Sequence, residues 1–93
     1  MTTRKIRAVT VTALGVSAKA DPEGLDDYDL FEVISEHGAT SFEAFEAMGK
    51  ALFGEKGWKD AKDGLRDEGG KLKLTRVGEF MDEVATQLDA LKN

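Results

Sequence analysis

The sequence contains no cysteine, one proline and one histidine among its 93 residues. Without cysteine the chain can form no disulfide bond, bind no metal through a thiolate and use no thiol nucleophile. The single histidine, His37, cannot by itself build a multi-histidine metal site. The single proline, Pro22, is consistent with a chain dominated by helices. No apolar run approaches the roughly 18 residues that span a bilayer, so we expect no membrane contact.

Basic charge is also scarce. The chain has 13 Lys and Arg residues against 18 Asp and Glu, a formal net charge of −5. A nucleic-acid-binding protein needs a clustered basic face, so this balance disfavours nucleic acid as a partner. Apolar residues make up 41% of the chain, which allows a small core and argues against wholesale disorder. A chain of this length forms one domain at most.

The N-terminal stretch RKIRAVTVTALGVSAKA, residues 4–20, has two interpretations. Its basic start, its apolar segment at residues 8–16 and the Ala-Lys-Ala at residues 18–20 imitate a secretory signal. The run Val-Thr-Val-Thr at residues 9–12 is β-branched at every position and alternates apolar with polar, which suits a strand. We therefore expect an extended N-terminal arm or strand over residues 1–20, with the signal as the alternative.

Capping and turn residues divide the next part of the chain into helices. Residues 21–24, Asp-Pro-Glu-Gly, predict a turn, because proline and glycine both interrupt regular structure. Apolar positions at residues 25–34 follow at helical spacing, and acidic residues near their start favour a helix of about ten residues. Gly38 predicts the end of this helix. Ser41 predicts the cap of a second helix, which Gly54 ends.

The second half predicts a weaker third helix and a strong last one. Trp58 and Leu65 lie on one apolar edge of a mostly charged segment. The turn at residues 67–70 and a short extended piece at residues 71–74 follow, and Thr75 is the expected cap of the last helix. The apolar stripe of that helix has steps of three and four, at Val77, Phe80, Met81, Val84, Leu88 and Leu91.

These patterns predict a mainly α fold. We expect a small bundle of three to four short helices with an N-terminal extended arm or strand. In this division, residues 1–20 are the arm and residues 21–93 are a single helical domain.

The acidic, glycine-rich stretch at residues 60–70 raises the question of cation binding. An EF-hand loop requires oxygen ligands at positions one, three and five, glycine at six and glutamate at twelve. Registers that start at Asp60, Asp63 and Asp67 each place a wrong residue at one of these positions, so we interpret the loop as a joint between helices. His37 lies at a helix end and is interpreted as a capping cation. We predict no catalytic residue, no metal, no cofactor and no enzymatic activity.

The aromatic and Met residues form an apolar set larger than so small a fold needs. Most of them are interpreted as core. The alternative is that some line an apolar groove for a helical partner, since thioethers and aromatic rings suit such surfaces. The same apolar excess permits a homo-oligomer. The candidate partner-binding residues are Phe42, Phe45, Met48, Phe53 and Trp58.

Three stretches carry a resemblance to a known family. They are LDDYDLFEVISE, SFEAFEAMGKALFGEKGWKDAKDGL and DEGGKLKLTRVGEFMDEV, which together span residues 25–84, about two-thirds of the chain. Their order resembles the small tail assembly chaperones of long-tailed, siphovirus-like bacteriophages and prophages. The pieces that align are Leu-Phe-Gly-Glu at residues 52–55 and Glu-Phe-Met at residues 79–81. Residues before 21 match loosely, and three glycines depart from the pattern: Gly57, Gly64 and Gly78.

The resemblance implies a virion-morphogenesis factor that acts in the cytoplasm of the host cell and is absent from the mature virion. It implies binding to the tape-measure protein and recruitment of the tail-tube protein while the tail polymerises. The residues themselves leave an alternative open, a small acidic regulatory or inhibitor protein of a mobile element, of antitoxin or DNA-mimic type. Such a mimic needs carboxylates arrayed on one face, whereas acids and lysines alternate at residues 59–63.

Overall fold

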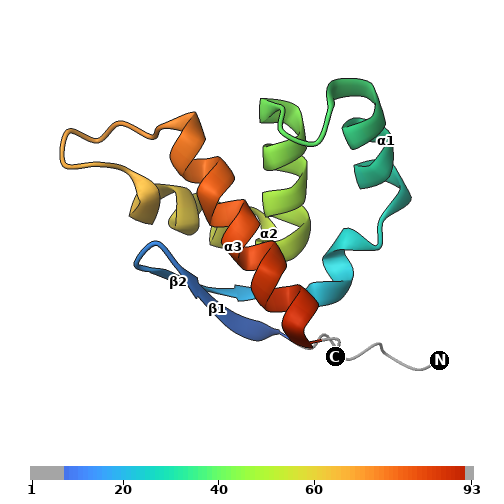
Figure 1. Ribbon diagram of the computed structural model, residues 1–93, viewed down its shortest axis with the longest axis horizontal. Helices are drawn as coiled ribbons and strands as arrows, with labels where there is room; N and C mark the ends of the chain where they lie inside the picture. Colours follow the sequence, from blue (N-terminus) through green and yellow to red (C-terminus); the bar gives the residue numbers. More distant parts are fainter. Residues whose placement is uncertain (1–7, 92–93) are drawn as a thin grey trace.

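The computed structural model describes residues 8–91, including the backbone but not the side chain of the last of them. This part of the chain is mostly helical, with three α-helices and one two-stranded antiparallel sheet, which confirms the mainly α prediction at its lower helix number. In chain order (Figure 1) the elements are β1 (Val9–Ala13), β2 (Val16–Ala20), the 3-10 helix η1 (Pro22–Leu25), α1 (Tyr28–His37), α2 (Phe42–Leu65) and α3 (Leu74–Leu91).

The predicted strand is half of a β-hairpin. β1 and β2 pair through a two-residue turn in which Leu14 and Gly15 both have positive φ, 51° and 79°. Positive φ at both central residues is the pattern of a type I′ turn, whose twist matches that of the flanking strands. The hairpin buries four side chains in the same core as the helices, so residues 8–20 pack on the bundle and do not extend from it: Val11, Ala13, Val16 and Ala20.

α1 has the expected length of ten residues and the expected end. It begins at Tyr28, three residues later than the predicted apolar pattern, because Leu25 is the last residue of the short helix η1 and Asp27 is the cap of α1. The Asp27 carboxylate caps it by accepting hydrogen bonds from the backbone amides of Asp29 (2.8 Å) and Leu30 (3.3 Å). At the other end Gly38 has a φ of 89°, the region that glycine enters without strain.

α2 confirms two of the predicted signals. The Ser41 hydroxyl accepts a hydrogen bond from the backbone amide of Ala44 at 3.1 Å and so caps the helix. Gly54, with φ 77° and ψ 167°, interrupts the helical geometry and separates α2 into two halves. The predicted second and third helices therefore meet at a kink without a loop between them, and they run in clearly different directions (Figure 1).

α3 begins earlier than predicted. It starts at Leu74, and the backbone amides of Arg76 and Val77 donate to the Lys73 carbonyl at 3.1 and 3.2 Å. Thr75 is therefore the second residue of the helix, and its predicted capping role is wrong. The predicted stripe is confirmed where side chains are described, since five of its members are buried: Val77, Phe80, Met81, Val84 and Leu88. The side chain of Leu91 lies outside the described part.

The core centres on Trp58, which is 1% exposed and the largest fully buried side chain among the described residues. Its indole ring lies directly on Gly49 of the first half of α2, where a Cβ atom would overlap the ring. The kink at Gly54 makes this contact, because it folds the second half of α2 against the first. Phe53 stacks on Trp58 with ring centroids 6.1 Å apart, and its ring lies 5.9 Å from that of Phe80 in α3.

Candidate protein-binding groove

An apolar groove of about 420 Å³ lies where both halves of α2 meet the segment that leads into α3. We call it the α2–α3 groove. Phe45 and Val77 are buried at its floor, at 8% and 6% exposure. Phe42 and Leu74 also line it but remain 65% and 57% exposed, so they form its rim. The remaining lining residues are Glu46, Lys62, Arg66 and Leu72.

The rim residues owe their positions to the starts of two helices. Ser41 caps α2, which places Phe42 in the first turn, at the end of the helix that the core does not cover. Leu74 is likewise the first residue of α3. Figure 1 shows both helix starts at the same end of the molecule. Both rim residues therefore come from helix N-termini, while Lys62 and Arg66 line the groove from the other end of α2.

The structure separates the five candidate partner-binding residues into two groups. Phe42 and Phe45 line the groove. Met48 and Phe53 are half-buried and pack against the core, and Trp58 is fully buried. Trp58 therefore offers no surface to a partner, whereas a partner-binding role for Met48 and Phe53 stays a prediction. The rim residue Leu74 was missed, although its alternation with lysines at residues 71–74 was a signal of partial exposure.

Glu46 and Lys62 of the groove lining form a hydrogen-bonded cluster with the buried Trp58. The Trp58 indole N–H donates to Glu46 Oε2 at 2.8 Å, and Lys62 Nζ donates to Glu46 Oε1 and Oε2 at 3.1 and 3.2 Å. Lys62 Nζ also lies 5.6 Å from the centre of the Trp58 ring, within reach of a cation–π interaction. The cluster joins the first half of α2 to the second half and so fixes the angle at the kink.

The pKa of Glu46 reflects the hydrogen bonds and charges of this cluster. Partial burial acts to raise it, but the hydrogen bonds from Trp58 and Lys62 and the positive charges of Lys62 and Lys50 outweigh burial, and the net pKa lies below the ordinary value of 4.5. The carboxylate is therefore ionised at neutral pH, and its hydrogen bonds connect the two halves of α2. It is a structural anion with its oxygens occupied.

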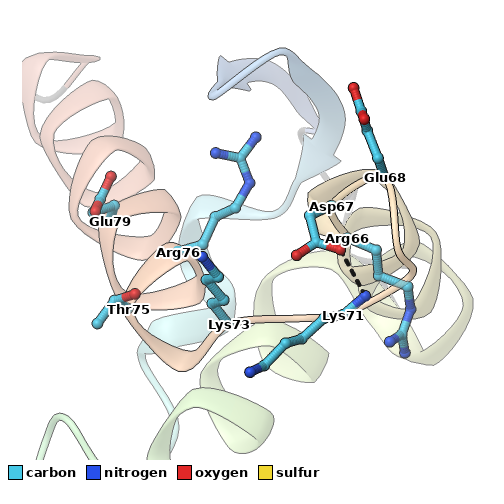
Figure 2. Close-up of a pocket in the computed structure, with 8 residues that line it drawn as sticks. All are labelled: Arg66, Asp67, Glu68, Lys71, Lys73, Thr75, Arg76 and Glu79. Atoms are coloured by element: carbon cyan, nitrogen blue, oxygen red, sulfur yellow. Dashed lines mark hydrogen bonds between the residues drawn. The ribbon is translucent and has the colours of Figure 1, made fainter.

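A second, charged pocket of about 520 Å³ surrounds the loop between α2 and α3. Figure 2 shows its lining side chains pointing in different directions, with Glu68 and Lys71 directed away from each other. Asp67 Oδ1 accepts from the backbone amides of Gly69 and Lys71, both at 2.9 Å, so this carboxylate holds the loop itself. Within residues 8–91, no three His, Asp or Glu side chains gather closely enough to hold a metal ion.

Arg76 has a role that the sequence pattern did not indicate. Its Nε donates to the Leu65 carbonyl at the end of α2 (3.0 Å), and its Nη2 donates to the Leu14 carbonyl in the hairpin turn (3.4 Å). A guanidinium can reach both acceptors because its donors are arranged as a rigid fork. This side chain therefore connects α3 to the end of α2 and to the β-hairpin.

Comparison of the chain with protein-family models, curated proteins and solved structures finds no match. The segments at residues 52–55 and 79–81 meet in the fold, since the Phe53 ring lies 5.9 Å from that of Phe80. A bilayer-spanning helix would need a longer apolar run than any helix within residues 8–91 provides. The exposed rim of the α2–α3 groove is thus the feature from which a function is best inferred.

Proposed function

We propose that this protein is a tail assembly chaperone of a long-tailed phage or prophage, and that its α2–α3 groove binds an apolar helix face of the tape-measure protein. The observation that carries the proposal is the pair of large apolar side chains, Phe42 and Leu74, exposed on either side of the buried floor. An amphipathic helix can place its apolar side chains between such a pair. The motif resemblance supplies the family and the partner.

The proposed mechanism is protection of an apolar surface. Tape-measure helices expose hydrophobic faces before the tail tube encloses them, and exposed apolar patches aggregate. A bound chaperone covers such a face, while its net charge of −5 keeps the complex dispersed. The tail-tube protein is then recruited to the covered segment, and the chaperone leaves in the host cytoplasm before the virion is complete.

The size of the groove suits reversible binding. A cavity of about 420 Å³ takes only a few side chains of a partner, whereas a stable interface of standard size involves roughly 20–30 residues on each side. Lys62 at the groove is 25% exposed and already paired with Glu46, so the polar part of the lining does not need a partner charge. Binding at this site therefore depends mainly on apolar contact.

The test is co-purification with the tape-measure protein, identified as the product of a very long coiled-coil reading frame immediately downstream. Phe42→Ala should weaken binding at least about tenfold, because a few central aromatic anchors carry most of the energy of such an interface. Phe31→Ala is a matched control, since Phe31 is 66% exposed but lies on α1. Full binding by a correctly folded Phe42→Ala variant would remove the groove from the interface.

A further inference from the structure

The outer face of α1 carries two aromatic side chains that the fold does not use. Tyr28 is 79% exposed and Phe31 is 66% exposed, whereas Leu30 on the opposite side is 5% exposed and turned toward α2. Residues three apart in a helix share a face, so the two rings occupy neighbouring positions. A helix that only covered α2 would carry polar residues there.

The same face is acidic. Glu32 follows Tyr28 by four positions and Glu36 follows by four more, so both carboxylates lie along the row that starts at the first ring. Residues 20–49 contain nine Asp and Glu residues, while all thirteen Lys and Arg residues of the chain lie elsewhere. The one base on α1 is His37, whose Nε2 lies 3.9 Å from Glu36 Oε2.

Helix stability explains only part of this charge. Asp27 and Asp29 lie at the start of α1, where negative charge is favourable and where Asp27 serves as the cap. Glu32 lies in the middle of the helix, and Glu36 lies in its last turn, where a negative charge opposes the helix dipole. The acidic residues beside Tyr28 and Phe31 are thus not needed to form α1.

We propose that this face, formed by Tyr28, Phe31, Glu32 and Glu36, docks a cationic amphipathic segment of a partner protein. Apolar side chains of that segment would cover the two rings, and its Lys or Arg side chains would pair with the carboxylates and contact the ring faces. A second copy of the chain is a poor occupant, because it would bring like charges together. An anionic membrane surface or a nucleic acid would be repelled for the same reason.

This site is independent of the α2–α3 groove and does not rest on the function proposed for it. Lys62 and Arg66 are the cationic lining residues of the groove, whereas the α1 face presents carboxylates and two rings. The groove therefore relies mainly on apolar contact, whereas the α1 face selects a cationic partner.

The test uses two synthetic amphipathic peptides of about 14 residues, roughly four helical turns, with the same Leu stripe. One peptide carries Lys and the other Glu on its polar face. We expect the Lys peptide, and not the Glu peptide, to shift the backbone amide resonances of α1. Phe31→Ala should weaken this binding at least about tenfold. Leu25→Ala, which removes a 40% exposed apolar side chain outside both this face and the α2–α3 groove, should leave it unchanged.

A charge variant and a folding control complete the design. Glu32→Gln with Glu36→Gln should weaken binding of the Lys peptide and flatten its dependence on salt, because exposed charge pairs are screened. Circular dichroism should show that each variant remains helical. Equal shifts of α1 by both peptides, or an equal loss on Leu25→Ala, would overturn the proposal. A dimer that Phe31→Ala converts to monomer would also overturn it, since a second copy would then cover the face.

Discussion

Removal of the Glu46 carboxylate should destabilise the fold far more than its partial exposure suggests. The side chain is 22% exposed, yet it accepts the Trp58 indole N–H at 2.8 Å and pairs with Lys62 at 3.1 Å. Glu46→Ala leaves the indole N–H of a 1% exposed residue without its acceptor. It also releases the two halves of α2 from each other. Glu43→Ala is the matched control, because Glu43 is exposed one turn earlier on the same helix.

The magnitude follows from the two lost contacts. An unsatisfied buried donor costs about 1–3 kcal/mol. The pair with Lys62 is partly exposed, so solvent screening limits it to about 0–1 kcal/mol. The two ranges add to about 1–4 kcal/mol, with a central value of about 2.5 kcal/mol. For a domain of this size, that central value lowers Tm by roughly 10–20 °C. Glu43→Ala should cost only about 0.3–1 kcal/mol, because it removes a first-turn carboxylate that favours the helix dipole.

The same carboxylate makes stability depend on pH. Because the pKa of Glu46 is lower in the folded protein than its ordinary 4.5, ionisation favours the folded state. The contribution is fully present above pH 4.5 and is lost as the pH falls through the lower folded pKa. In Glu46→Gln this part of the acid sensitivity is absent. The stability difference between the parent protein and this variant should therefore shrink as the pH is lowered from 5 to about 3.

Urea unfolding measures both effects. Trp58 is the only tryptophan in the chain and is buried, so its fluorescence reports exposure of the core, with circular dichroism as an independent probe of helix content. The free energy of unfolding of Glu46→Ala should lie well below that of Glu43→Ala at pH 7. If the free energies of unfolding of the two variants agree within about 0.5 kcal/mol, the cluster of Glu46, Trp58 and Lys62 contributes nothing to stability and the reasoning is refuted.

Two further substitutions test how the helices are held together. Gly49→Ala places a Cβ atom inside the Trp58 ring, so it should lower the free energy of unfolding in urea by about 3 kcal/mol or more. In Gly78→Ala the new Cβ would make an ordinary contact of 3.6 Å with Phe45. This variant should therefore raise the free energy of unfolding by about 0.5–1 kcal/mol. Arg76→Lys keeps the positive charge but loses the forked donor that reaches the Leu65 carbonyl. It should lower Tm by roughly 4–8 °C, which corresponds to about 1 kcal/mol of stability. An unchanged Tm would show that a simple cation suffices.

The helices were predictable because their boundaries are local. Ser41 and Gly54 act through their own backbone geometry and side chains, so each signal could be read without knowledge of the rest of the fold. The second strand of the hairpin was not recognised. Its turn, Leu14 and Gly15, lacks the Asn-Gly or Asp-Gly pair that signals a two-residue hairpin, and its sequence VSAKA has little β-branched character.

The candidate site was only partly predictable because burial of aromatic residues is decided by distant contacts. Phe42 and Phe45 lie three apart on one helix and have the same pattern in the sequence, yet one is 65% and the other 8% exposed. The first turn of α3 provides Val77 beside Phe45 and leaves Phe42 on the rim. The sequence places Trp58 on the one apolar edge of a weak helix, where it is a candidate for partner binding as well as for the core. The direction of the kink at Gly54, which buries it on Gly49, is not encoded in any local pattern.

The arrangement of α1 and the α2–α3 groove around the first half of α2 allows both surfaces to be occupied together. α1 contributes Leu30 and Val33 to a pocket whose α2 lining includes Ala47 and Ala51. The groove instead uses α2 positions 42, 45 and 46. At about 100° per residue these two sets lie on opposite sides of the helix. A partner seated in the groove is therefore separated by the α2 helix and α1 itself from the outer rings, and neither occupant needs to displace the other.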